Sequence, residues 1–146
     1  MIFSFVVTKL RWLARVPLFP QIFDTMLLLG AVLRDRRVLR IRESLEDRAS
    51  DSLGVGLTNH RLGGVGFVFD GVELGHLHGN GLFDAFVGTD RDRVVRNGLA
   101  SPHHLFARSN WVSVWITTDK EVASALELLR IAKLRLHRSS SGSHRR

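Results

Sequence analysis

An Asp-Gly pair separates two extended apolar runs in residues 66–78, and no other pattern in the chain restricts its local structure as far. Asp70 and Gly71 suit the central positions of a type I′ turn, so the segment G-F-V-F-D-G-V-E-L-G-H-L-H predicts a β-hairpin with a two-residue loop. Three cross-strand pairs follow from that loop: Phe69 with Val72, Phe67 with Leu74, and Val65 with His76. Because side chains alternate along a strand, His76 and His78 would lie on the apolar, inward face of this hairpin.

Further extended segments lie on both sides of the hairpin. They are predicted strands over Leu82–Val87 and Trp111–Thr117, and a loop or weak, bulged strand over Gly54–Gly64. Between the two strands, Asp90–Asn97 is predicted as a short helix closed by Gly98. Ser101-Pro102 then leads the His103-His104 pair into a loop.

Helical patterns flank the strands. Pro20 can occupy a first helical turn, and Ile22–Leu33 is apolar enough to predict a largely buried helix. A second, charged helix is predicted over Arg36–Ala49, with one apolar stripe made of Val38, Ile41, Leu45 and Ala49. Thr118 and Glu121 form a capping-box signature for a final helix that reaches about Leu136.

This order of elements predicts an α+β fold, a small antiparallel sheet with helices packed on one face, N-terminal helices and a C-terminal helix. We divide the chain into an N-terminal apolar, helical extension over residues 1–35, one domain over residues 36–136, and a disordered basic tail over residues 137–146. The sequence leaves the oligomeric state open.

The net charge of +7 does not by itself indicate a nucleic-acid partner. Much of the excess lies near the two ends of the chain, whereas residues 34–51 alternate basic and acidic side chains, as in a solvated, salt-bridged helix face. No stacking platform or recognised nucleic-acid motif accompanies the charge. The absence of cysteine excludes disulfides, thiolate nucleophiles and Cys-based zinc sites.

No apolar run reaches the ~20 residues that a membrane-spanning helix needs. The N-terminal aromatic residues Phe3, Phe5, Trp12 and Phe19 could touch a membrane, but we expect them to dock on the domain's own core. We therefore expect a soluble, cytoplasmic protein whose partner is a small-molecule ligand.

Four of the seven histidines fall in two clusters, G-H-L-H-G-N-G over residues 75–81 and S-P-H-H over residues 101–104. Together with an acidic residue between the clusters, they make the predicted catalytic set: His76, His78, Asp84, His103 and His104. The neighbouring glycines lack the lysine and hydroxyl residue of a phosphate-binding loop. Gly79, Gly81 and Trp111 are predicted to contact substrate, Trp111 by stacking on a planar ligand. In an alternative role, Trp111 and Trp115 fill the space between the sheet and the terminal helix.

Three roles for the histidines stay open. A histidine assisted by Asp84 could remove a proton from an acidic enol or phenol, giving an electron-rich anion that oxygen attacks. Alternatively, His76, His78 and either His103 or His104, with or without Asp84, could bind a divalent metal such as Fe(II), since H-x-H on a strand places both rings on one side. In the third role the imidazoles are structural, and no cofactor is present. His60 could join the site or lie exposed in a loop.

Three spaced motifs carry a family resemblance: E-L-G-H-L-H-G-N-G-L-F-D, G-L-A-S-P-H-H and S-N-W-V-S-V-W-I, followed by an apolar helix. Over residues 63–136 the chain resembles the luciferase-domain family, mostly prokaryotic proteins that share a domain with fungal luciferases. The five predicted catalytic residues and Trp111 occupy matching positions. The chain departs from the family pattern at Ala85, where proline is common, and at Asn110, where glycine is usual.

The fungal members of this family oxidise a hydroxypyrone with molecular oxygen and have no firmly assigned cofactor. The resemblance therefore implies an oxygen-using oxidoreductase that acts on a small, planar, electron-rich molecule. The small α+β layout also resembles the MmcQ/YjbR-like fold, some of whose members are described as DNA-binding. That resemblance implies a non-catalytic ligand- or DNA-binding module as the alternative function.

Overall fold

The computed structural model describes residues 19–61 and 63–143. Residues Phe3, Phe5 and Trp12 lie outside this part of the chain, and the side chain of Phe19 is not described, so their predicted docking on the core stays a prediction. Among the described residues, no helix combines the length and the apolar character needed to cross a bilayer.

Within residues 19–61 and 63–143, six antiparallel strands form one open sheet in the order β1-β2-β3-β4-β6-β5. The strands are β1 (Gly56–Asn59), β2 (Val65–Phe69), β3 (Val72–Leu77), β4 (Leu82–Phe86), β5 (Ser101–Pro102) and β6 (Trp111–Trp115). The helices are α2 (Phe19–Arg34), α3 (Arg37–Leu53), the 3-10 turn η2 (Gly88–Asp90), α4 (Arg91–Arg96) and α5 (Asp119–Ser143). This arrangement confirms the predicted α+β fold, with β1 as the weak strand expected in the glycine-rich segment.

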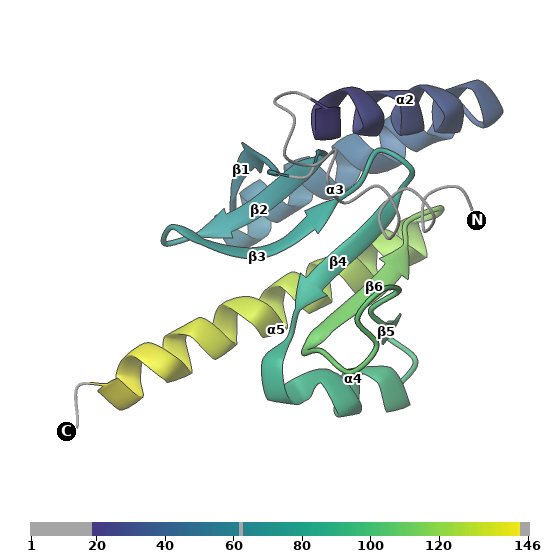
Figure 1. The fold of residues 1–146 in the computed structure, drawn as a ribbon. Helices are drawn as coiled ribbons and strands as arrows, with labels where there is room; N and C mark the ends of the chain where they lie inside the picture. The colour runs from purple at the N-terminus through teal and green to yellow at the C-terminus, as the bar shows by residue number, and fades with distance from the viewer. Residues whose placement is uncertain (1–18, 62, 144–146) are drawn as a thin grey trace.

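The hydrophobic core lies between the sheet and two helices, α3 and α5, which pack against each other on one face of it (Figure 1). The sheet contributes Phe67, Leu77, Phe83, Ala85 and Val112, and the helices contribute Leu45, Ala49, Val122, Ala125 and Leu129. Helices on one face of an antiparallel sheet leave the opposite face for other uses. The predicted site residues His76 and Asp84 lie on that opposite face.

Helix α5 begins with the predicted capping box. The Thr118 backbone N–H donates to the Glu121 carboxylate at 2.8 Å, and the Lys120 N–H donates to the Thr118 hydroxyl at 3.3 Å. The helix continues past the predicted end near Leu136 to Ser143, so residues 137–143 of the expected disordered tail are helical. Residues 144–146 lie outside the described part of the chain.

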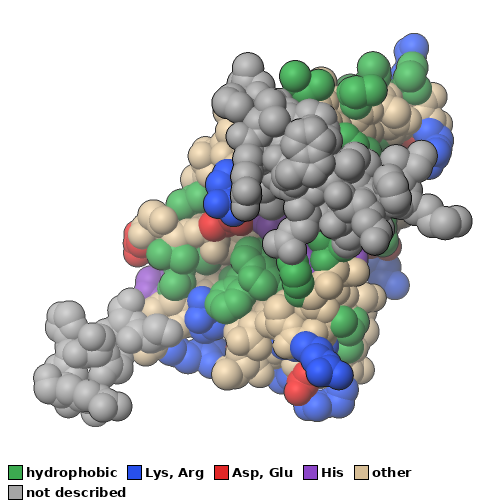
Figure 2. All heavy atoms as spheres, in the orientation of Figure 1, with side chains coloured by type: hydrophobic (Ala, Val, Ile, Leu, Met, Phe, Trp, Pro, Cys, Tyr) green, Lys and Arg blue, Asp and Glu red, His purple; other side chains and the backbone are tan. Residues whose placement is uncertain are grey.

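The expectation that the helix at Ile22–Leu33 is largely buried is wrong for one of its faces. Four apolar side chains spaced as on one side of a helix are between 57% and 80% exposed: Ile22, Met26, Leu29 and Leu33. Figure 2 shows hydrophobic side chains at the surface along this helix. Helix α2 packs on α3 and on the turn at Gly79 through its other side, so only part of its apolar surface is covered.

The hairpin forms at the predicted turn but in a different register. Asp70 and Gly71 adopt φ of 50° and 75°, and Phe69 pairs with Val72. A bulge then leaves Leu74 without a partner, so Phe67 pairs with Gly75, not with Leu74, and Gly66, not Val65, pairs with His76.

This bulge decides which way the site residues point. One inserted residue moves every later side chain to the other face of the strand. Phe67 lies in the core, whereas His76 lies on the face opposite α3 and α5. The expectation that the histidines share the inward, apolar face of the hairpin is therefore wrong.

The tryptophans of β6 lie on the histidine face as well. Ser113 pairs with Asp84, which pairs with His76, so the side chains of Trp111, Ser113 and Trp115 alternate with the core residue Val112. The alternative role in which Trp111 and Trp115 fill the space between the sheet and the terminal helix is wrong. Trp115 is 54% exposed.

Candidate active site

Asp84 lies at the centre of the candidate site and is fully buried. The register of the sheet places His76, Asp84 and Ser113 side by side on the three adjacent strands β3, β4 and β6. His78 follows β3 by one residue, and His103 and His104 lie in the loop after β5. All five predicted catalytic residues therefore meet at one place, although they come from three separate segments.

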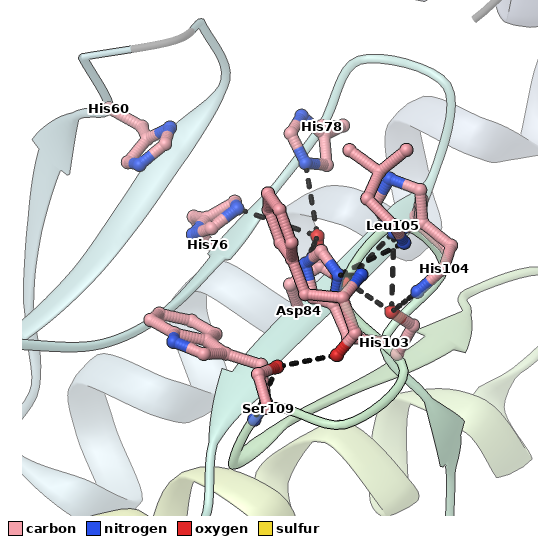
Figure 3. Close-up of polar contacts among 12 residues, drawn as sticks. His60, His76, His78, Asp84, His103, His104, Leu105 and Ser109 are labelled. Carbon is pink, nitrogen blue, oxygen red and sulfur yellow. Dashed lines mark hydrogen bonds and ion pairs between the residues drawn. The ribbon is translucent and has the colours of Figure 1, made fainter. Parts of the chain in front are cut away.

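Three imidazoles face the same oxygen of Asp84. The Nε2 atoms of His76, His78 and His103 lie 3.5, 3.2 and 3.5 Å from Oδ2. Figure 3 shows His76 and His78 on one side of the carboxylate and the loop histidines on the other.

The second oxygen of Asp84 binds the loop through Ser113. The Ser113 hydroxyl donates to Oδ1 at 2.5 Å and accepts from the His104 backbone N–H at 3.3 Å. His104 Nδ1 lies 3.4 Å from the same hydroxyl oxygen and 3.6 Å from Oδ1. Because the only hydrogen of the hydroxyl points to Asp84, His104 Nδ1 is the donor in its contact with Ser113.

Asp84 is ionised despite its burial. Burial acts to raise the pKa of this carboxyl, but hydrogen bonds from His103 and His104, and then from His76 and His78, hold the pKa far below its usual range. The site therefore contains a fixed negative charge in a buried place, which favours donors or cations around it.

The backbone fixes the tautomer of His103. The N–H groups of Leu105 and Phe106 lie 3.2 and 3.1 Å from His103 Nδ1, and a backbone N–H can only donate. Nδ1 must then be the unprotonated nitrogen, so Nε2 carries the proton and points it at Asp84. His103 is a hydrogen-bond donor that positions the carboxylate.

His76 lies between two carboxylates. Its Nδ1 is 2.9 Å from Glu73 Oε1, and its Nε2 faces Asp84 on the other side. Burial acts to lower the pKa of His76, but hydrogen bonds to Asp84 and Glu73 and the charges of both groups outweigh it and raise the pKa to about 9. His76 is therefore an imidazolium at neutral pH.

His60 joins this edge of the site and is buried, so it does not lie exposed in a loop. Its ring stacks on that of His76, with centroids 3.9 Å apart and an angle of 8° between the planes. Burial, and then the charge of His76, lower the pKa of His60 to about 4. Its 3.4 Å contact with Glu73 is therefore not an ion pair, because Glu73 binds the charged His76 more closely.

These pKa shifts predict that, of the two stacked rings at neutral pH, His76 is positively charged and His60 is neutral. In protein freed of metal ions by chelation, His76 is expected to lose a proton only as the pH rises through about 9, and His60 to gain one only as it falls through about 4. Long-range ¹H–¹⁵N spectra, which report the protonation of each ring nitrogen, check this order. In urea both residues should titrate near the ordinary histidine value of about 6.5. A charged His60 beside a neutral His76 at pH 7 would contradict the assignment.

Sequence reasoning missed Glu73 and Ser113. In a regular strand Glu73 and His76 would lie on opposite faces, but the bulge at Leu74 brings them to the same face. Ser113 could have been found from the predicted strand Trp111–Thr117, had that strand been paired with the one holding Asp84. The sequence contains no direct signal of that pairing.

The structure accounts for Gly79 by packing. A Cβ on this residue would lie 2.3 Å from the Asp24 backbone oxygen and 2.9 Å from the Leu28 nitrogen, so only glycine allows α2 this close. The Gly79 N–H also donates to the Asp24 carboxylate at 2.7 Å. Gly81 shapes the same turn with a φ of 87°. Substrate contact by either glycine stays a prediction.

Trp111 borders the cluster. Its ring centroid lies 5.5 Å from that of His76, 5.4 Å from that of Phe86 and 6.5 Å from that of His103. The residue is partly exposed. A partly exposed aromatic ring beside buried imidazoles suits the predicted stacking on a planar ligand, which stays a prediction.

Three overlapping groups of side chains could hold a metal ion within the described residues. They are His60 with Glu73 and His76, His76 with His78 and Asp84, and Asp84 with His103 and His104. In each group the ligand atoms lie within 4.8 Å of one another. The tautomer of His103 counts against the third group, because its Nε2 carries a proton and cannot bind an ion as well.

Comparison with known protein families gives a match to part of the chain. Residues 71–132 match a family model described as Luciferase domain, and this confirms the resemblance that the motifs indicated. No curated protein and no solved structure matches the chain. The matched segment holds Asp84 and its four surrounding histidines.

Proposed function

We propose that this site belongs to an oxygen-using enzyme that removes a proton from a small, planar, electron-rich molecule such as an enol or a phenol. The observation that carries the proposal is the buried, ionised Asp84 surrounded by four imidazoles and a serine hydroxyl. Burying so many polar groups lowers the stability of the fold. Buried titratable groups with shifted pKa values are found mainly at functional sites. The Luciferase domain match supports the oxygen-using class.

His104 is the proposed general base. Its side chain is 22% exposed, whereas those of His76, His78 and His103 are 9–11% exposed, so a substrate reaches it most easily. With a proton held on Nδ1 by Ser113 and Asp84, the ring presents Nε2 as the basic atom. A carboxylate behind the ring also stabilises the imidazolium that forms.

The charge of His76 suits the product of that step. A substrate that transfers its proton to His104 becomes an anion, and a nearby imidazolium stabilises an anion in a buried site. Molecular oxygen then adds to the electron-rich carbon with formation of one C–O bond. The resulting peroxide anion takes the proton back from His104, which returns the base to its starting state.

Oxygen consumption tests this proposal. The protein is mixed with a panel of hydroxypyrones and phenols, and uptake is followed with an oxygen electrode while products are identified by mass spectrometry. We expect uptake with at least one panel compound, a large loss of kcat in His104→Gln, and a higher KM with unchanged folding in Trp111→Phe. His137→Ala, an exposed histidine on α5, is the matched control.

Three outcomes would count against the proposal. Equal kcat in His104→Gln and the unchanged protein would remove His104 from the mechanism. Binding of panel compounds without oxygen uptake would favour the non-catalytic ligand-binding module, and a salt-dependent gel shift with DNA would favour the DNA-binding alternative.

A further inference from the structure

We propose that His76, His78 and Asp84 bind one divalent first-row transition-metal ion, with Fe²⁺ as the expected ion and Glu73 as the outer partner of His76. The proposal names a cofactor for the same site and rests on the proposed function for its catalytic meaning. Metal binding itself can be measured without any substrate.

The distances around Asp84 are compatible with ligands of one metal ion. The Nε2 atoms of His76 and His78 lie 3.5 and 3.2 Å from Oδ2. Ligands about 2.1 Å from one metal ion lie about 3.0 Å apart at a right angle and about 3.4 Å apart at a tetrahedral angle.

The three ligand atoms also lie close enough together as a set. Nitrogen atoms of His76 and His78 and an oxygen of Asp84 are within 4.8 Å of one another. Two imidazoles and one carboxylate form the donor set of non-haem Fe(II) oxygenases, and three protein ligands leave coordination positions for substrate or oxygen. An ion there would polarise a bound substrate oxygen and make its proton easier to remove.

The contact with Glu73 orients His76 for this role. Glu73 Oε1 accepts from His76 Nδ1 at 2.9 Å, so Nδ1 keeps its proton and Nε2 is the nitrogen at which an ion would replace the second proton. The bound ion would then supply the positive charge that the imidazolium supplies in metal-free protein. Histidines that bind metals usually donate their other N–H to a carboxylate or a carbonyl in this way. The His60 ring stacks on a face of the His76 ring and limits the rotation of that ring.

His103 is left outside the ligand set. Two backbone N–H groups occupy its Nδ1, so its Nε2 keeps a proton. That proton is expected to stay on His103 Nε2, directed at Asp84, whether or not an ion is bound. The assignment therefore separates His76 and His78, which bind the ion, from His103, which positions Asp84.

Binding of Fe²⁺ under anaerobic conditions, and of Zn²⁺ in air, tests the site. Chelator-treated protein is dialysed against each ion, and bound metal is measured by elemental analysis. We expect one ion per chain, an affinity at least about 100-fold lower in His76→Ala and His78→Ala, and about tenfold lower in Glu73→Gln. His103→Ala removes an outer partner of Asp84 and should cost about tenfold, as Glu73→Gln does, whereas the exposed control His137→Ala should leave the affinity unchanged.

If the alanine variants fail to fold, a measurement on the unchanged protein still tests the ligand assignment. In long-range ¹H–¹⁵N spectra, addition of Zn²⁺ should shift the Nε2 signals of His76 and His78 and leave the protonated Nε2 of His103 in place. Loss of the His103 proton, or shifts confined to other histidines, would overturn the ligand assignment.

The outcomes distinguish this inference from the proposed function. Failure to bind either ion, together with oxygen uptake that survives chelation, would overturn the metal site and leave the enzyme proposal standing. Binding of one ion without turnover of any panel compound would support the metal site and count against the enzyme.

Discussion

Replacement of Asp84 by alanine is expected to lower the free energy of unfolding by about 3–5 kcal/mol, because it removes one partner of a buried ionic cluster. The variant leaves the charged His76, the His103 N–H and the Ser113 hydroxyl without their shared acceptor. It also removes a proposed metal ligand, so oxygen uptake and metal binding should fall to background. Urea unfolding of metal-free protein measures the first effect.

Two further variants test whether the loss of the buried carboxylate charge causes the loss of stability. Asp84→Asn keeps the side-chain volume but places an amide beside the rings, so it should lose most of the same stability through charge and hydrogen bonding. Asp92→Ala removes a carboxylate that is exposed on α4 and should change stability by less than about 0.5 kcal/mol. An Asp84→Ala protein as stable as the unchanged one would show that the cluster is not the buried network described.

Truncation of Phe83 should be nearly as damaging, for a different reason. Phe83 is fully buried between the sheet and the helices and meets Phe67 edge to face, with ring centroids 5.6 Å apart. Phe83→Ala removes most of a large core side chain and leaves a cavity, so we expect the free energy of unfolding to fall by about 3–5 kcal/mol.

The paired control is Trp115→Ala on the neighbouring strand. Trp115 is a larger aromatic residue, but it lies on the opposite face and is 54% exposed, so its truncation should cost less than about 1 kcal/mol. Comparable losses in the two variants would contradict the assignment of the core to the face covered by α3 and α5.

The two predictions describe the two faces of one sheet. Neighbouring residues on β4 face opposite ways, Phe83 into an apolar core and Asp84 into a polar cluster. Burying an ionic site costs folding free energy, and packing on the apolar face of the sheet offsets that cost. This division is common in proteins that maintain buried functional groups. The division of the chain into an extension, a domain and a tail stays a prediction.

Much of the fold was predictable because its signals are local. The Asp-Gly turn, the alternation of β6 and the Thr118–Glu121 capping box depend on neighbouring residues, and each appears where the sequence indicates it. The members of the cluster were predictable for a similar reason, since the histidines and Asp84 fall in short motifs at the ends of predicted strands. These motifs also carry the family resemblance.

Tertiary structure alone decided how those residues face one another. A bulge of one residue at Leu74 turns His76 away from the core and brings Glu73 to its side, and no local pattern marks that bulge. The exposure of one side of α2 depends on what packs beside it, and the tautomer of His103 depends on two backbone N–H groups of its own loop. The sequence by itself determines which helices and strands form, because turns, caps and periodicity act between neighbouring residues. Strand register, and the face on which each side chain lies, depend on packing between distant segments. That packing therefore fixes the chemistry of the site.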